Sequence, residues 1–357
     1  MKTLVHFLLL AGSVVSAAEL GFSGPQEIEV TAEALSADDI AIQSYRASYS
    51  GTEGPWTVEA GIGFIQYRET YVPVLFGTTE KLDEETLQAD LTFTRKFNEQ
   101  WSASLLVSAY DGFSDYRSIW ISEYYRQLFG AFPDYHGPDP HGQSIGAKAR
   151  WDYLPGTGRA ELSFNFGRDE IAPGWGFNSA IGKPEPGVES LSTAGGGARV
   201  EQALNGWLKT DAAIALRHIT DRKTRVSLNH SWVAAAGPLA FRLSGGYSEE
   251  PPSFDSSYVS ALVEWTFLPH WSANVGYRIY QDSGEIASSG FDALAPPVRS
   301  TEIFGGLAWD HGDFAVSAGV GLLATDYDAL SEDNEFFGNL YRDRDWLTFR
   351  LAASHRF

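Results

Sequence analysis

The residues of this chain that could perform chemistry are few, and their spacing suits catalysis poorly. His230 and Ser231 adjoin within a segment of alternating polarity. Because successive residues of a strand point to opposite faces, this pair cannot act together as base and nucleophile. The pattern predicts an interface histidine instead, and we expect neither a catalytic residue nor an enzyme.

Two polar segments have the composition of metal-binding loops. Residues 134–141 include two histidines and two aspartates, and residues 326–335 include five carboxylates. The first is dense in Pro and Gly, which indicates a rigid turn, and the second lacks the glycine-containing EF-hand pattern. Gly195 to Gly197 lead into strand-like residues, so they form no phosphate loop. We expect no metal and no cofactor.

The elements that must position any functional residues repeat one unit. An alternating segment of about ten residues leads into a tight turn, a second such segment and a longer connection, which is typical of an antiparallel barrel. The tight turns lie at residues 96–100, 155–158, 205–206, 236–238, 268–270 and 311–313. The longer connections are predicted at 67–83, 111–142, 171–195, 282–298 and 325–344, with shorter ones at 219–223 and 249–256.

The polar faces of these segments carry charges of both signs. In a soluble sandwich such a face would meet water, whereas in a barrel it would line the lumen. Charges in a narrow lumen can pair and fill it, or can create a transverse field that selects solutes. The candidate lining residues are Lys148, Arg150, Arg199, Lys209, Arg217, Arg225, Arg242, Arg278, Glu59, Asp90, Glu161, Glu201, Asp211 and Glu264.

The composition excludes several classes of protein. With 46 acidic and 26 basic residues, the net charge is −20, which argues against nucleic acid as a partner. The absence of cysteine excludes disulfides, lipidation at a cysteine and thiolate metal sites. Beyond the N-terminus no apolar run reaches about eighteen residues, so helical membrane spans are not expected.

Tryptophan positions favour a membrane barrel over a soluble sandwich. Seven tryptophans lie within a few residues of the tight turns, as in an aromatic belt at one membrane interface. They are Trp101, Trp151, Trp207, Trp232, Trp265, Trp271 and Trp309.

The N-terminus predicts export from the cytoplasm. Met1 and Lys2 form a short positive region, an apolar run covers 4–15, and small residues follow. This pattern indicates a secretory signal peptide over residues 1–18, cleaved after Ala17 or Ala18.

The last eleven residues, LTFRLAASHRF, form an amphipathic strand that ends on an aromatic residue. With Phe349, Leu351 and Phe357 on its apolar face, it resembles the C-terminal assembly signal of Gram-negative outer-membrane β-barrels. The resemblance implies both termini in the periplasm and several partners. These are outer-membrane lipid, lipopolysaccharide, periplasmic chaperones and the barrel-assembly machinery.

The strand count depends on the first fifty residues. Fourteen strands follow from Trp56 onward, and two more, around 27–35 and 45–49, would give sixteen. With sixteen, residues 111–142 become the third outer loop, and the chain is similar to general diffusion porins, whose third loop narrows the channel. The acidic motif of that porin loop is not present. This segment has a helical pattern, and it can either pack on the surface or fold into the pore.

The segment 26–32 supports a competing hypothesis. Glu27 to Ala32 resembles the TonB box of energised receptors, which pairs with TonB by β-augmentation. Only about twenty residues separate it from the first certain strand, so a plug domain has no room.

We therefore predict an all-β, transmembrane up-and-down barrel of fourteen or sixteen strands, closed by a strand that ends in Phe357. Residues 1–18 are a signal peptide, 19–55 a first strand pair or an extension, and 56–357 the barrel. The predicted function is an outer-membrane channel or transporter for small solutes. The alternatives are a plugless TonB-linked uptake protein and a solid structural or adhesion barrel.

Overall fold

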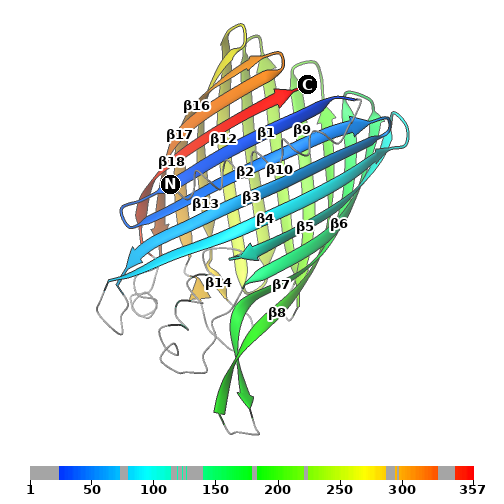
Figure 1. Cartoon of the computed structure of the whole chain (residues 1–357). Helices are drawn as coiled ribbons and strands as arrows, with labels where there is room; N and C mark the ends of the chain where they lie inside the picture. Colours follow the sequence, from blue (N-terminus) through cyan, green and yellow to red (C-terminus); the bar gives the residue numbers. More distant parts are fainter. Residues whose placement is uncertain are drawn as a thin grey trace.

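Sixteen antiparallel strands form one closed barrel in the part of the chain that the structure describes (Figure 1). The structure is a computed structural model, and it describes residues 24–72, 79–113, 119, 123, 126, 140–178, 183–220, 224–286, 294–295, 297–328 and 342–357. The predicted up-and-down barrel is confirmed, with sixteen strands rather than fourteen. The predicted signal peptide lies outside the described residues. Among those residues, no helix has the length and apolarity of a membrane span.

The barrel strands follow one another around the wall in chain order. They are β1 (Gln26–Ser36), β2 (Ile40–Glu53), β3 (Trp56–Tyr71), β4 (Glu80–Lys96), β5 (Trp101–Gly112), β6 (His141–Leu154), β7 (Gly158–Asn178), β8 (Lys183–Ala203), β9 (Leu208–Ile219), β10 (Thr224–Ala236), β11 (Leu239–Glu250), β12 (Phe254–Leu268), β13 (Trp271–Asp282), β16 (Val298–His311), β17 (Phe314–Tyr327) and β18 (Arg344–Arg356). The two-residue strands β14 (Glu285–Ile286) and β15 (Leu294–Ala295) pair only with each other.

The first and last strands close the barrel. The register between β1 and β18 runs from Glu27 opposite Arg356 to Ser36 opposite Leu347. At its end, Gln26 and Phe357 exchange two backbone hydrogen bonds of 3.1 and 3.0 Å. Glu27 to Ala32 therefore lie in a barrel strand whose two edges pair with β2 and β18. A TonB-like partner would need a free edge, and this conformation offers none.

The two ends of the barrel differ. One end of the barrel, uppermost in Figure 1, carries the start of β1, the end of β18 and the short turns, and we call it the terminal end. At the opposite end, which we call the loop end, lie the strand ends that border the longer connections, such as Tyr71 and Glu80 or Gly112 and His141. Tight turns at the terminal end use glycines with positive φ, such as Gly237 (62°) and Gly312 (65°), a conformation that costs glycine little.

One predicted loop is wrong. Residues 171–178 and 183–195 extend the hairpin of β7 and β8, which pair as far as Asn178 opposite Lys183, with one register shift between Glu170 and Ala172. The neighbouring strands pair with this hairpin only up to Glu170 and Thr193, so its tip extends beyond the barrel wall (Figure 1). Proline and glycine in this segment hid the strand pattern, because backbone pairing needs no alternation of apolar side chains.

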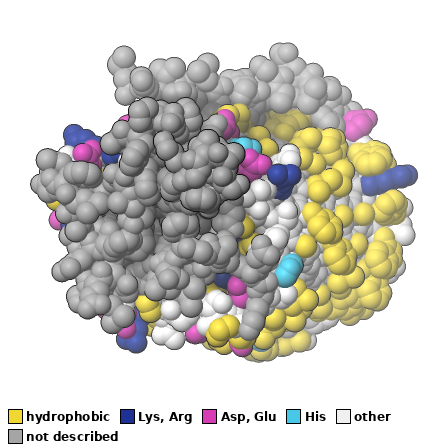
Figure 2. Space-filling model, turned by 90° about the horizontal axis from the view of Figure 1, so that it is seen from below, with side chains coloured by type: hydrophobic (Ala, Val, Ile, Leu, Met, Phe, Trp, Pro, Cys, Tyr) yellow, Lys and Arg dark blue, Asp and Glu magenta, His cyan; other side chains and the backbone are white. Residues whose placement is uncertain are grey.

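The outer face of the barrel is apolar. Leu162, Phe164 and Phe166 alternate along β7 and remain 53%, 61% and 62% exposed. Figure 2 shows such hydrophobic side chains gathered over the flank of the barrel. Near the terminal end tryptophans lie on this face, and Trp101 and Trp151, opposite each other on β5 and β6, stack at 5.6 Å between ring centroids. An apolar exterior with a belt of aromatic side chains at its edge is typical of a lipid-facing wall.

This assignment predicts opposite outcomes for two adjacent substitutions in β11. Leu243 is 52% exposed on the outer face, and Ser244 faces inward between Ser231 and Ser260. Leu243→Arg should lower the free energy of unfolding in lipid by about 2–4 kcal/mol, since it places a charge against hydrocarbon. Ser244→Arg should change it by under about 1 kcal/mol, because it adds a charge to the lumen. Urea titration in phospholipid vesicles measures both, and equal losses would contradict the assignment of faces.

Candidate functional site

The lumen is the candidate functional site. Strand register places all fourteen candidate lining residues on the face opposite the exposed apolar side chains. Arg150, Glu161 and Arg199, for example, lie opposite one another on β6, β7 and β8. The predicted assembly residues Phe349, Leu351 and Phe357 lie on the outer face, 41–50% exposed. Their role in assembly stays a prediction.

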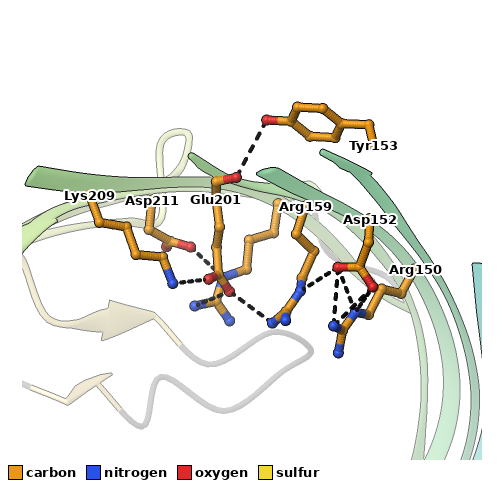
Figure 3. A network of polar contacts seen from close by, with 8 residues as sticks. Arg150, Asp152, Tyr153, Arg159, Glu201, Lys209 and Asp211 are labelled. Atoms are coloured by element: carbon orange, nitrogen blue, oxygen red, sulfur yellow. Dashed lines mark hydrogen bonds and ion pairs between the residues drawn. The ribbon is translucent and has the colours of Figure 1, made fainter. Parts of the chain in front are cut away.

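A chain of ion pairs covers the lumen wall near the terminal end (Figure 3). Arg150 donates from Nε to both carboxylate oxygens of Asp152, at 3.2 and 3.1 Å. Arg159 donates to the same carboxylate at 3.1 Å and lies 3.6 Å from Glu201.

The same chain continues across β8 and β9. Glu201 also pairs with Lys209 and, at 3.5 Å, with Arg199. Arg199 in turn donates to Asp211 at 2.6 Å. Four cations thus share three carboxylates across four neighbouring strands, so most of this wall is internally neutralised.

A second, more buried group of charges lies at the loop end, across the seam between β1 and β18. We call Asp39, Glu69, Arg342 and Arg344 the seam cluster. Arg344 is only 3% exposed, and its Nη2 lies 2.8 Å from both Asp39 and Glu69. Arg342 donates to Asp39 at 3.1 Å. Because Asp39 follows β1, Glu69 belongs to β3 and Arg344 begins β18, these bonds tie the seam together.

The seam cluster shifts the acidity of Asp39. Burial alone would raise the pKa of this carboxyl, but hydrogen bonds and charge from Arg344 and Arg342 lower the pKa below its usual value of 3.8.

An apolar cluster fills part of the lumen beside the seam cluster. Inward-facing side chains from β2, β3, β4 and β18 meet there and are buried: Ile40, Tyr67, Tyr71, Leu82 and Trp346. Ile119, from the connection between β5 and β6, packs among them and is 3% exposed.

Two more described residues of that connection lie at the same place. The hydroxyl of Tyr71 donates to Glu123, and Arg126 donates to Glu123 at 2.6 Å. Of the two arrangements considered for residues 111–142, these positions fit the one that folds into the barrel. Ile119 and Glu123 therefore lie against inward-facing side chains of the barrel at the loop end.

Glycines let lumen side chains reach across an intervening strand. Arg46 on β2 pairs with Asp90 on β4 at 2.6 Å, over Gly61 of β3, where an added Cβ would lie 2.2 Å from the guanidinium. Likewise, the Tyr258 hydroxyl donates to Asn229 at 3.0 Å over Gly246, where a Cβ would lie 2.4 Å from both side chains.

Several other charged residues of the lumen have no ion-pair partner among the described residues. Within the described residues, no ion pair within 4 Å joins Lys148, Arg217 or Arg242 to a carboxylate, and none joins Glu59 or Glu264 to a cation. Glu264 lines a hollow of about 420 Å³ near the terminal end, together with small side chains such as Ser272 and Ala308. Charges that face water in a lumen act directly on a passing solute.

The histidine singled out by sequence lies outside the lumen. His230 is on the outer face, with its Nε2 2.8 Å from the Thr210 hydroxyl and its ring 4.8 Å from that of Trp232. Most of the segments 134–141 and 326–335 fall outside the described residues. In the described part of the chain, no three potential metal ligands gather at one point.

Sequence reasoning missed the seam cluster and Arg159. Arg344 and Asp39 are 305 positions apart, and only closure of the barrel brings them together. Arg159 shares the inward face of β7 with Glu161, two residues further on, so the alternation of this strand is the signal that could have found it.

Comparison with known proteins bears on the fold. No family model matches the chain, and no curated protein matches it. Among solved structures, a bacterial polysaccharide outer membrane secretin is 9% identical with a TM-score of 0.52, over 93% of this chain and 98% of that one. OprB of Pseudomonas putida, at low pH, is 8% identical with a TM-score of 0.50, over 97% and 96%. CdiB from Acinetobacter baumannii is 9% identical with a TM-score of 0.55, and this chain spans 60% of its length. At these identities the similarity concerns the barrel fold alone.

The lowered pKa of Asp39 predicts a specific acid sensitivity. A carboxyl whose pKa is lower in the folded protein stabilises the fold above its unfolded pKa, and this stabilisation is lost as the pH falls through the folded value. Asp39→Asn should therefore reduce the urea midpoint at neutral pH. The difference from the unsubstituted protein should begin to shrink as the pH falls through about 4, near the unfolded pKa, and should vanish only below the lowered pKa of the folded protein. Asp38→Asn is the control, because this neighbour makes neither arginine contact. A difference that persists in acid would contradict the ion-pair explanation.

The close approach over Gly246 predicts a second effect on stability. In Gly246→Ala the new methyl group must displace Tyr258 and Asn229 and break their hydrogen bond, at a cost of about 1–3 kcal/mol. In Gly245→Ala the new Cβ meets nothing closer than 3.4 Å, so the loss should stay under about 1 kcal/mol. Urea unfolding in vesicles compares the two adjacent variants. Equal stability would show that the lumen side chains move aside freely.

Proposed function

We propose that this chain is an outer-membrane channel that passes small solutes by diffusion, without chemistry on the solute. The observation that carries the proposal is the distribution of side chains over a closed barrel. The outer face is apolar and suits lipid, while the inner face carries charges of both signs, several of them without a partner among the described residues. A barrel that only anchored other structures would have no use for unpaired charges in its interior.

The route of a solute follows from the two ends. At the loop end it passes the connection that carries Ile119 and Glu123, which narrows the entrance. It then meets unpaired cations such as Arg217 and Arg242, and carboxylates such as Glu264. Near the terminal end the paired wall over β6 to β9 offers little net charge. Selection would arise from lumen width and from these charges.

The proposal includes a location and partners. Cleavage of residues 1–18 would release the chain into the periplasm of a Gram-negative cell, where chaperones and the barrel-assembly machinery would receive it. The terminal end with its tryptophans would face the periplasm, and the loop end would meet lipopolysaccharide. TonB coupling is the weaker alternative, because β1 would have to leave the barrel wall to pair with TonB.

A solid barrel without transport is the second candidate. The apolar cluster around Ile119 and the seam cluster occupy part of the loop end, and this observation favours it. The two candidates differ in whether water and ions cross the lumen.

Conductance in planar bilayers separates the two candidates. A channel should give discrete current steps. In a salt gradient, Arg242→Gln should shift the reversal potential toward that of a cation-selective pore, since it removes an unpaired lumen cation. Arg95→Gln is the matched control, because Arg95 lies against Trp56 and Phe97 near the terminal end, outside the lumen. A heat-modifiable, folded barrel that never conducts would support the solid barrel and end the channel proposal.

A further inference from the structure

A hollow of about 300 Å³ opens in the lumen wall toward the loop end, where β12, β13, β16 and β18 turn inward-facing side chains toward one another. The register explains how it is built. Tyr258 lies directly opposite Tyr280, and Arg278 lies opposite Glu302. Arg350 reaches the hollow from β18, and the β17 residue opposite it, Gly319, has no side chain to block the way.

The charged residues around the hollow differ in how closely they pair with opposite charges. Glu302 is 3% exposed, and Arg278 donates to one of its oxygens at 3.2 and 2.5 Å. Both residues line the hollow, but the charge of Arg278 is matched within this pair, which is neutral as a whole. Arg350 is about half exposed. It contacts two carboxylates at long distances, 3.7 Å to Glu302 and 3.5 Å to Glu33. It makes no hydrogen bond to any described residue. Its guanidinium therefore presents free donors to the hollow.

The remaining walls are aromatic and apolar. The hydroxyls of Tyr258 and Tyr280 are held by Asn229 and Asp282, at 3.0 and 2.8 Å. Leu35 and Leu323 line the hollow from β1 and β17, and both also pack on the apolar cluster around Ile119. One rim thus offers a cation, and the opposite walls offer apolar area.

This combination discriminates among solutes. A cation would be repelled by Arg350, and an inorganic anion would leave the leucine walls in contact with water. A neutral polyol would leave the guanidinium without the anion that its geometry favours. A carboxylate attached to a ring or a short apolar chain satisfies both parts, because the guanidinium binds it bidentately while the apolar part covers the leucines.

We propose that this hollow is a binding subsite for small organic monocarboxylates, with Arg350 as the residue that holds the carboxylate. This inference rests on the proposed channel function, since a solute must enter the lumen to reach it. It makes the permeating class a monoanion with an apolar body, held briefly at the wall before it moves on.

Binding is tested directly by fluorine NMR of 4-fluorobenzoate added to the folded protein in detergent. Line broadening should saturate with the unsubstituted protein, and Arg350→Gln should weaken binding roughly tenfold through loss of the charge-assisted hydrogen bonds. Arg350→Lys keeps the charge but loses the bidentate geometry, so it should fall between the two. Arg95→Gln, which removes an arginine outside the lumen, should bind as the unsubstituted protein does. Neutral 4-fluorobenzyl alcohol should bind at least tenfold more weakly than the benzoate.

The outcomes separate this inference from the channel proposal. If Arg350→Gln and Arg350→Lys both bind the benzoate unchanged, or if the alcohol binds equally well, the subsite assignment is overturned even where the barrel conducts. If binding depends on Arg350 but no current is seen, the subsite stands and the channel proposal fails. Heat-modifiable migration on a gel confirms that each variant is folded before its binding is compared.

Discussion

Pairing of every strand edge is the constraint on which the rest of this structure depends. In hydrocarbon, an unpaired backbone amide or carbonyl costs several kcal/mol, so a sheet can cross a membrane only if it closes on itself. Here closure rests on the ladder between β1 and β18, which ends in the reciprocal bonds of Gln26 and Phe357. The same ladder requires that β18 be amphipathic. It also occupies one edge of the segment that resembles a TonB box, so that this segment is part of the barrel wall.

Closure also fixes what each side chain meets. Once the sheet is closed, alternate residues face lipid or lumen, and polar groups on the inner side find partners on their own strand, on a neighbouring strand or across one or two strands. The ion pairs follow this rule: Arg150 and Asp152 share one strand, Arg199 reaches the next, and Arg46 passes over Gly61 to Asp90. Because a charge in the lumen keeps contact with water, these pairs need not be perfect, and some residues such as Arg242 remain open to solutes.

The fold can be predicted almost completely from the sequence, because alternate residues of each strand face lipid and must be apolar. Strand existence and the face of all fourteen lining residues follow from that alternation, and the belt of tryptophans follows from their places beside the tight turns. The hairpin tip of β7 and β8 does not, since Pro173, Pro184 and Pro186 obscure a ladder that only the backbone records. The seam cluster could not be predicted either, because Asp39 stands between strands, outside any alternating pattern, and meets Arg344 only through closure. Whether residues 111–142 fold inward depends on the packing of Ile119 against β2, β3 and β18, which no local pattern specifies.

The C-terminal strand contributes to both faces of the barrel. Its outer face presents Phe349 and Leu351 to lipid, while its inner face presents Arg344 to the seam cluster and Arg350 to the hollow above Glu302. A strand that failed to pair with β1 would leave Arg344 without Asp39 and would open the wall beside Arg350. The charges that shape the lumen at the loop end can therefore exist only in a barrel that has already closed. A chain built this way acquires these lumen charges in the same step that makes it compatible with lipid.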